Sequence, residues 1–137
     1  TGIEICHMHY RYGKILVVSF NQTGGVDWYQ TLAKAQHSID DEGGFLSFIQ
    51  SKSSTGNLEF IYNGAIGKTG RADEVMENPE KSQLRMVSVN SNGQLSEPNL
   101  ASSYPVMPAV SWIERKGSIL TLSQDNGSAR LVRFRNQ

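Results

Sequence analysis

Apolar and polar residues alternate in short runs along this chain, and polar turns rich in Gly separate the runs. In residues 26–32, for example, Val26 and Trp28 alternate with Asp27 and Tyr29. A period of two is typical of a β-strand, and no long amphipathic helix pattern is present. The pattern predicts an all-β fold of at least nine strands, paired mainly with their sequence neighbours in antiparallel hairpins. The predicted strands are 3–10, 15–20, 26–32, 45–49, 58–62, 84–89, 94–97, 109–113, 118–122 and 129–134.

One pattern occurs twice, 69 residues apart. Residues 15–26 and 84–95 each contain a β-rich run, a polar turn and a second run that restarts on an aliphatic residue. Gly24 and Gly93 occupy the same place in the two turns. Asn tolerates left-handed backbone and Gly adopts it without steric cost, so both turns suit a tight hairpin.

Three segments are predicted to connect the strands. Residues 33–44 are polar, and residues 63–82 form a long loop in which 72–78 could be a short helix. The polar composition of 63–82 leaves little apolar surface to offset chain ordering, which costs about 1–2 kcal/mol per residue, so we expect it to be the least ordered internal segment. Pro105 and Pro108 restrict the chain to an extended connector.

The strands fall into three blade-like sets, 1–35, 43–100 and 105–137, with three, four and three strands. Short strands in sets of four with Gly-rich turns are typical of β-propeller blades, and a β-sandwich is the alternative. We expect a single β-repeat domain that is a fragment of a longer propeller. Strand 129–134 should then pair with residues 3–10 or form an exposed edge that favours self-association, with pairing of the two ends preferred.

Residues 15–32, ILVVSFNQTGGVDWYQTL, resemble the repeat of bacterial secreted β-propeller proteins (SBBP-like repeats of Bacteroidetes-type surface proteins). Residues 33–49 and 58–64 are similar to the core of an uncharacterised group of such proteins. The resemblance covers residues 10 to 135, and it implies blades, an extracytoplasmic location and no catalytic residues. Two departures are Glu97 at the position equivalent to Trp28 and a number of repeats too small for a closed ring.

Composition gives no support to several classes of partner or site. Thirteen basic and thirteen acidic residues cancel, so charge gives no reason to expect nucleic acid or an anionic membrane as partner. No apolar run approaches the roughly 20 residues of a membrane-spanning helix. The single cysteine, Cys6, cannot form an internal disulfide. The chain starts at Thr1 without an initiator Met, and we expect that it was cut from a longer protein.

Two clusters offer metal-ligand chemistry. His7 and His9 share one face of a strand, and such a pair can begin a zinc or copper site if His37 and a fourth ligand join it. The simpler interpretation is an exposed pair on an edge strand. Three carboxylates in a row, Asp40, Asp41 and Glu42, could hold calcium, but the alternating ligand spacing is absent, which favours a solvated loop or an Asx turn.

The remaining motifs give less information about function. Residues 123–127 resemble the first half of a sialidase-type Asp box, a structural hairpin, but Ala129 and Arg130 replace the Thr and Trp of its second half. Lys68-Thr69 lacks the Gly that a phosphate loop requires, because Tyr62 stands there. Five aromatic residues could form a carbohydrate or peptide platform, although packing between blades is the simpler role: Trp28, Tyr29, Tyr62, Tyr104 and Trp112.

The sequence therefore predicts a non-enzymatic binding or scaffolding module of an extracytoplasmic bacterial protein, without catalytic, cofactor-binding or metal residues. Its partner would be a protein or a glycan that contacts loops such as 33–44 and 63–82. Part of a propeller glycan hydrolase and a purely structural surface domain are the alternatives. A hydrolase would need two carboxylates flanking the scissile bond, and no pair can be placed from the sequence.

Overall fold

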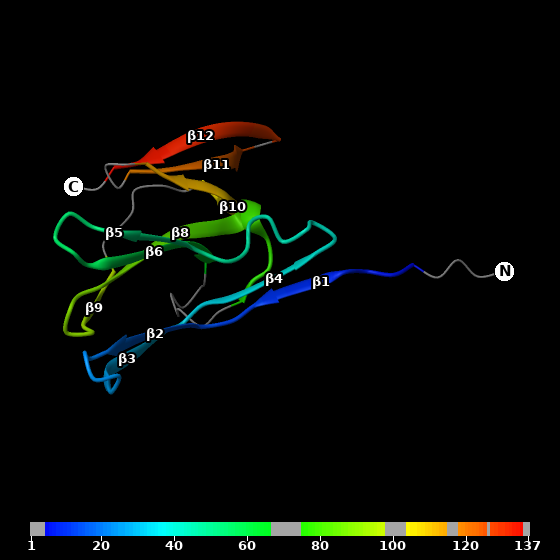
Figure 1. Ribbon diagram of the computed structural model, residues 1–137. Helices are drawn as coiled ribbons and strands as arrows, with labels where there is room; N and C mark the ends of the chain where they lie inside the picture. The colour runs from blue at the N-terminus through cyan, green and yellow to red at the C-terminus, as the bar shows by residue number, and fades with distance from the viewer. Residues whose placement is uncertain (1–4, 67–74, 98–103, 115–117, 126, 136–137) are drawn as a thin grey trace.

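β-Strands make up the regular structure of the described residues, apart from one turn of 3-10 helix (Figure 1). The computed structural model describes residues 5–66, 75–97, 104–114, 118–125 and 127–135. The strands are β1 His9–Tyr12, β2 Ile15–Phe20, β3 Val26–Leu32, β4 Ala35–Ile39, β5 Ile49–Lys52, β6 Leu58–Ala65, β7 Val75–Met76, β8 Ser82–Val89, β9 Leu95–Ser96, β10 Val106–Ile113, β11 Ile119–Asp125 and β12 Ser128–Phe134, and η1 is Pro79–Lys81. The predicted all-β fold with sequential antiparallel neighbours is confirmed.

Three sheets are stacked around two hydrophobic cores. The β2–β3 hairpin lies on one side of the four-stranded sheet β5-β6-β8-β9, and the sheet β10-β11-β12 lies on the other (Figure 1). The first core joins the hairpin to the middle sheet and contains Ile15, Val17, Leu32, Phe60, Tyr62, Val87 and Val89. The second core joins the middle sheet to the third and contains Ile49, Ile61, Leu84, Val106 and Ile119.

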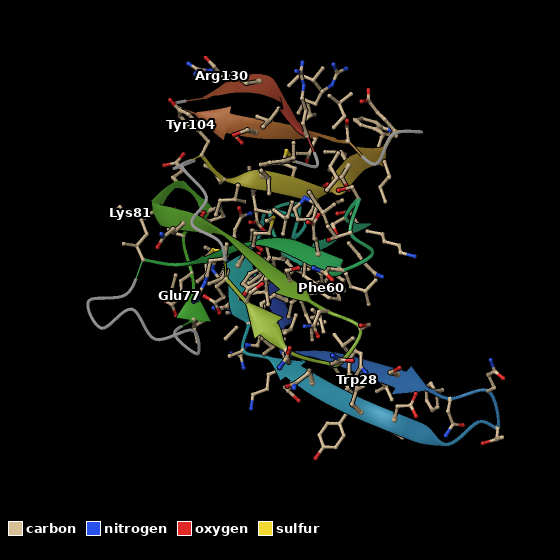
Figure 2. The ribbon with its side chains drawn as sticks, turned by 90° about the vertical axis from the view of Figure 1, so that its left-hand side faces the viewer. Trp28, Phe60, Glu77, Lys81, Tyr104 and Arg130 are labelled. Atoms are coloured by element: carbon tan, nitrogen blue, oxygen red, sulfur yellow. The ribbon has the colours of Figure 1, made fainter. Side chains whose placement is uncertain are left out.

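The middle sheet supplies both cores because neighbouring residues of a strand point to opposite faces. In β6, Phe60 and Tyr62 enter the first core, and Ile61 enters the second. Figure 2 shows Phe60 in the middle sheet and Trp28 on the hairpin that covers it. Strands buried on both faces contain near-continuous apolar runs, as LEFIY and LRMVSV do here.

The fourth sheet, β1-β4-β7, extends the hairpin. β1 runs into β2 and β3 runs into β4, so together they form one long antiparallel ribbon. Ile15 pairs with Leu32, and Tyr12 pairs with Gln36. Two residues separate Tyr12 from Ile15 and three separate Leu32 from Gln36, so the ribbon has one additional residue on its β3–β4 side. On its other side β4 pairs with β7 in parallel, Ala35 with Val75.

Two predictions for the connections were wrong. Residues 33–44 contain strand β4, whose inward side chains are polar, so hydrophobic alternation could not reveal it. Within the proposed helix 72–78, Val75–Met76 form strand β7, and residues 72–74 lie outside the described residues. The first residues of the predicted loop 63–82 belong to the end of β6. Residues 67–74 of this loop lie outside the described residues, so the prediction of low order is not tested there.

The expected pairing of the two chain ends is not observed for the described residues. His9 and Tyr10 pair with Ile39 and Ser38 of β4, so the N-terminal strand is in a different sheet from β12. Among the described strands, β12 pairs with β11 alone. Figure 1 shows the segment that leads to β1 extending away from β12. The outer edge of β12 is therefore not covered by β1.

Three hairpin turns share one hydrogen-bond pattern. In the turn 21–25, the backbone N–H of Asn21 donates to the carbonyl of Gly25, and the backbone carbonyl of Asn21 accepts the N–H of Gly24. Gly24 has a φ of 86°. Asn90 makes the same bonds with Gln94 and Gly93. The turn 53–57 makes them as well, although Ser53 replaces the Asn of the other two turns. A left-handed residue at the fourth position is the usual device of a three-residue hairpin loop.

Candidate functional site

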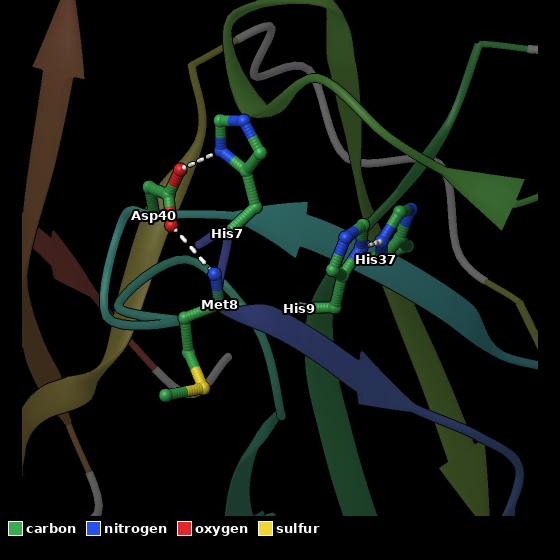
Figure 3. Close-up of polar contacts among 5 residues, drawn as sticks. All are labelled: His7, Met8, His9, His37 and Asp40. Carbon is green, nitrogen blue, oxygen red and sulfur yellow. Dashed lines mark hydrogen bonds and ion pairs between the residues drawn. The ribbon is translucent and has the colours of Figure 1, made fainter. Parts of the chain in front are cut away.

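One face of the β1-β4-β7 sheet gathers the three histidines of the protein (Figure 3). The alternation of β1 and its extension places His7, His9 and Arg11 on this face. The antiparallel register brings His37 opposite Arg11, and the parallel pairing of β4 with β7 adds Glu77 beside it. The histidines that the sequence singled out thus lie on an exposed edge strand, with His37 on its neighbour.

His7 forms a hydrogen bond with Asp40, with 2.6 Å between Nδ1 and a carboxylate oxygen. The other oxygen of Asp40 accepts the backbone amide of Met8 at 2.7 Å (Figure 3). These two hydrogen bonds favour the charged carboxylate, and they lower the pKa of Asp40 from its ordinary value. Asp40 has a φ of 55°, a left-handed conformation that Asp tolerates better than most residues.

His9 and His37 make a ring-to-ring hydrogen bond. Nδ1 of His9 is 3.0 Å from Nε2 of His37, the ring planes differ by 4°, and the ring centroids are 5.3 Å apart. Two parallel rings that are so close at their nitrogens and so far apart at their centres must lie end to end in about one plane. One nitrogen donates and the other accepts, so their lone pairs do not converge on a common point as the ligands of a tetrahedral metal would.

Of the two neighbouring carboxylates, Asp41 is engaged within the protein and Glu42 is exposed. One oxygen of Asp41 accepts the hydroxyl of Ser38 at 2.5 Å and the amide of Gly43 at 2.9 Å, as in an Asx turn. Glu42 is exposed and left-handed, with a φ of 58°. Across the described part of the chain, no group of three or more His, Cys, Asp or Glu side chains is arranged to hold a metal ion.

A buried polar network lies behind the histidine face. Gln36 is 2% exposed, and its Oε1 accepts both Nζ of Lys34 at 2.9 Å and the amide of Ser47 at 2.8 Å. Its Nε2 donates to the carbonyl of Asn63 at 2.8 Å. Gln36 therefore fixes β4 to the middle sheet by hydrogen bonds instead of apolar contact, and each polar group avoids the cost of burial without a partner.

Asn63 continues this network into the third sheet. It is fully buried, and its side-chain amide donates to the carbonyls of Phe45 and Val106 at 2.8 and 2.7 Å. Its Oδ1 accepts the amide of Val106 at 2.9 Å. The amide side chain thus pairs with Val106 as a neighbouring strand would, and it joins β6 to the start of β10.

Lys34 is a buried cation beside this face. It is 4% exposed, and its Nζ lies 5.5 Å from the centre of the Tyr12 ring, within the range of a cation–π contact. Burial lowers the pKa of Lys34 from 10.5 to about 8 because the charged form loses hydration. Lys34 and Tyr12 thereby join the polar network to the surface.

A pocket of about 330 Å³ opens where the end of β1, the start of β4 and β7 meet. Its volume is within the range of small-molecule sites. Its lining residues include a cation, a carboxylate, an imidazole and the exposed ring of Tyr12. The described lining residues are Arg11, Tyr12, Gly13, Ala35, Gln36, His37, Val75 and Glu77. Arg11, His37 and Glu77 of the histidine face border this pocket, together with Gln36 of the buried network and the exposed Tyr12.

The remaining sequence candidates do not join this site. Tyr62 is buried in the first core, where burial raises its pKa, and Trp28 packs against the same core. Tyr29 and Trp112 are exposed on separate sheets, and Tyr104 contacts Arg130. The five aromatic residues therefore do not form one platform. Ser123 is buried and donates to the carbonyl of Pro105, whereas Lys68 and Thr69 lie outside the described residues.

Sequence reasoning missed the residues that build the pocket, namely Arg11, Tyr12, Gln36 and Glu77. A usable signal was present, because Lys34, Gln36 and Ser38 alternate with Ala35, His37 and Ile39. The period of two is that of a strand, but the inward positions are polar, so the strand shows no apolar alternation.

Comparisons with protein-family models, with curated proteins and with solved structures give no match to this chain. No helix among the described residues is long and apolar enough to cross a membrane. The geometry of the site is therefore the basis on which a function can be argued.

Proposed function

We propose that this chain is a non-enzymatic, β-propeller-type binding module of an extracytoplasmic bacterial protein, and that its ligand is a glycan held in the β1-β4-β7 pocket. The observation that carries the proposal is the pocket itself, whose lining includes the exposed Tyr12 together with Arg11, His37 and Glu77, residues that can donate or accept hydrogen bonds. The extracytoplasmic setting and the bacterial source rest on the resemblance of residues 15–32 to secreted repeat proteins.

The stacking of the sheets supports the propeller over the sandwich. A sandwich has two sheets and one core, whereas here the middle sheet has a core on each face. Propeller blades pack in this way, each between two neighbours. The recurrence of one turn geometry at 21–25, 53–57 and 90–94 is also what repeated blades would produce.

The pocket chemistry suits a sugar. Tyr12 is 44% exposed and offers an apolar ring face to the C–H groups of a pyranose. Arg11 donates and Glu77 accepts, so vicinal hydroxyl groups would find partners of both kinds. Few, oriented polar groups beside an aromatic ring are typical of specific small-ligand sites.

The same lining argues for binding over catalysis. Glycoside hydrolysis commonly requires two carboxyl groups on either side of the scissile bond. The described lining of the pocket contains one, Glu77. Asp40 and Asp41, the next carboxylates on this sheet, are held by His7 and by the turn at Gly43.

A glycan array probed with the labelled chain tests the proposal, followed by calorimetric titration of any oligosaccharide that is retained. We expect Tyr12→Ala and Glu77→Gln to weaken binding at least tenfold. Tyr29→Ala is the matched control, because Tyr29 is 68% exposed on β3 outside the pocket. Retention of no glycan, or equal binding by the pocket variants, would refute the proposed function. Release of new reducing ends from a bound glycan would instead support a hydrolase.

A further inference from the structure

The stack of three sheets ends in two apolar faces that no described residue covers. The head face is the outer side of the β2–β3 hairpin, where Leu16, Phe20 and Tyr29 are 64%, 63% and 68% exposed. The tail face is the outer side of the sheet β10-β11-β12, where Trp112 and Leu131 are 55% and 63% exposed. Val18 and Val26 complete the head face, and Leu120 and Leu122 complete the tail face.

The head face has a buried counterpart inside the chain. With the shift of 69 residues, Val18 and Phe20 of β2 correspond to Val87 and Val89 of β8. Val87 and Val89 are 2% and 1% exposed, because the preceding sheet covers them in the first core. The head face is thus the counterpart of a face that, one repeat later, packs against a preceding sheet.

The same shift of 69 residues also relates the residues that face the next sheet in the stack. Ile15 and Val17 correspond to Leu84 and Met86. Ile15 and Val17 face the middle sheet in the first core, and Leu84 and Met86 face the third sheet in the second core. The hairpin and the middle sheet therefore turn equivalent residues towards the sheet that follows each of them. The tail face is the side of the third sheet that points away from the middle one, where a following sheet would lie.

We propose that the head face binds the tail face of a second copy of this chain, and that the partner's head face closes on the first copy's tail face in the same way. Two different surfaces then meet in each contact, and a ring forms where the rotation between copies closes it. Two copies bring six stacked sheets together, which is within the range of about four to eight blades in closed propellers. The proposal concerns surfaces away from the pocket and does not depend on what the pocket binds.

A second copy of the chain fits as the partner because the head face matches a face that the chain already buries against its own preceding sheet, and the tail face lies where a following sheet would pack. Large exposed apolar patches on a soluble chain commonly mark such contacts. The uncovered outer edge of β12 lies beside the tail face and would be shielded by the same contact.

Sedimentation velocity and light scattering of the purified chain, from low micromolar to near-millimolar concentration, test the proposal. We expect a concentration-dependent species of twice the 15.2 kDa chain mass. Longer assemblies that depend on both faces would support the same head-to-tail contact without ring closure. A strictly monomeric chain over the whole range would overturn it.

Two charge substitutions separate this contact from other kinds of dimer. Phe20→Asp on the head face and Leu131→Asp on the tail face should each give a monomer, because each variant spoils one side of every contact. A mixture of the two should regain a one-to-one dimer through its one intact head–tail pair, at least tenfold weaker than the unaltered dimer. A mixture that stays monomeric, or a dimer sensitive to one face alone, would overturn the proposal.

Ile39→Asp is the control, because Ile39 is 47% exposed on β4, outside both faces. Circular dichroism and thermal unfolding confirm that each variant is folded. Leu16→Lys and Trp112→Lys test the same two faces if an Asp variant does not fold.

Discussion

The indole of Trp28 lies directly against the backbone of Gly93, so the first hairpin touches the turn that repeats its own (Figure 2). A Cβ atom built on Gly93 would be 2.8 Å from Cδ2 of Trp28, and Nε1 of Trp28 donates to the carbonyl of Ser91 at 2.9 Å. Gly93 also has a φ of 77°, in the left-handed region. Two independent constraints therefore require Gly at this position.

Gly93→Ala should destabilise the protein more than Gly24→Ala. Both residues are left-handed, which costs Ala about 1–2 kcal/mol, but a Cβ on Gly24 meets nothing within 4 Å. The clash with Trp28 should add roughly 1–3 kcal/mol at Gly93 alone. Urea unfolding of the two variants measures the difference. Equal losses for Gly93→Ala and Gly24→Ala would contradict the clash, and in a Trp28→Ala background the difference should disappear.

Asn63→Ala should cost several kcal/mol of unfolding free energy, although it removes only a small polar side chain. The change leaves the amide and carbonyl of Val106 and the carbonyl of Phe45 without their partner, at about 1–3 kcal/mol for each buried group. Asn92→Ala is the matched control, because Asn92 is exposed in a turn. Chemical denaturation compares the two variants, and a loss at Asn63 as small as at Asn92 would contradict the bridging role.

The burial of Lys34 should make stability rise with pH in the alkaline range. Its pKa is about 8 in the folded chain and 10.5 as the ordinary value, so between these values the unfolded chain binds more protons. Stability then increases with pH through this window, by at most about 3 kcal/mol from this residue. Lys34→Met should flatten the rise. Urea unfolding of both proteins at a series of pH values tests this, and parallel curves would show that Lys34 does not contribute.

Removal of His7 should raise the pKa of Asp40 towards its ordinary value. The hydrogen bond from His7 is the largest cause of the lowered pKa, ahead of the bond from the Met8 amide. Because the folded pKa is lowered, the stability that Asp40 contributes is present above its ordinary pKa and is lost as pH falls through the lowered value. NMR titration of the Asp40 carboxyl carbon in His7→Ala measures the change. His9→Ala is the control and should shift this pKa less, since its charge is the smallest cause.

The hairpins were predictable because their chemistry is local. Asn and Gly at fixed places within five residues determine the turns at 21–25 and 90–94, and the flanking apolar alternation determines β2, β3 and β8. Strand β10 was only half predicted, because Pro108 argues against a strand. The structure accommodates it at the irregular register between Met107 and Trp112.

The site was less predictable because it depends on contacts between distant segments. His7 and His9 were identified as a pair on one strand face, but His37 and Asp40 join them only through the β1–β4 register. Gln36 and Asn63 are polar residues at inward positions, and their burial becomes favourable once Ser47, Phe45 and Val106 supply partners. No local pattern indicates such partners in advance.

The position of the middle sheet has a consequence for the order in which the protein opens. Loss of the β2–β3 hairpin exposes one core, and loss of the third sheet exposes the other, whereas β6 and β8 can separate only when both cores have been opened. Hydrogen exchange should therefore be fastest at the two ends of the stack and slowest at Phe60–Tyr62, with global unfolding as the route to exchange there. The protein would unfold from the two outer sheets towards the middle sheet, as a short solenoid does. Asn63 lies in the middle sheet, which unfolds last.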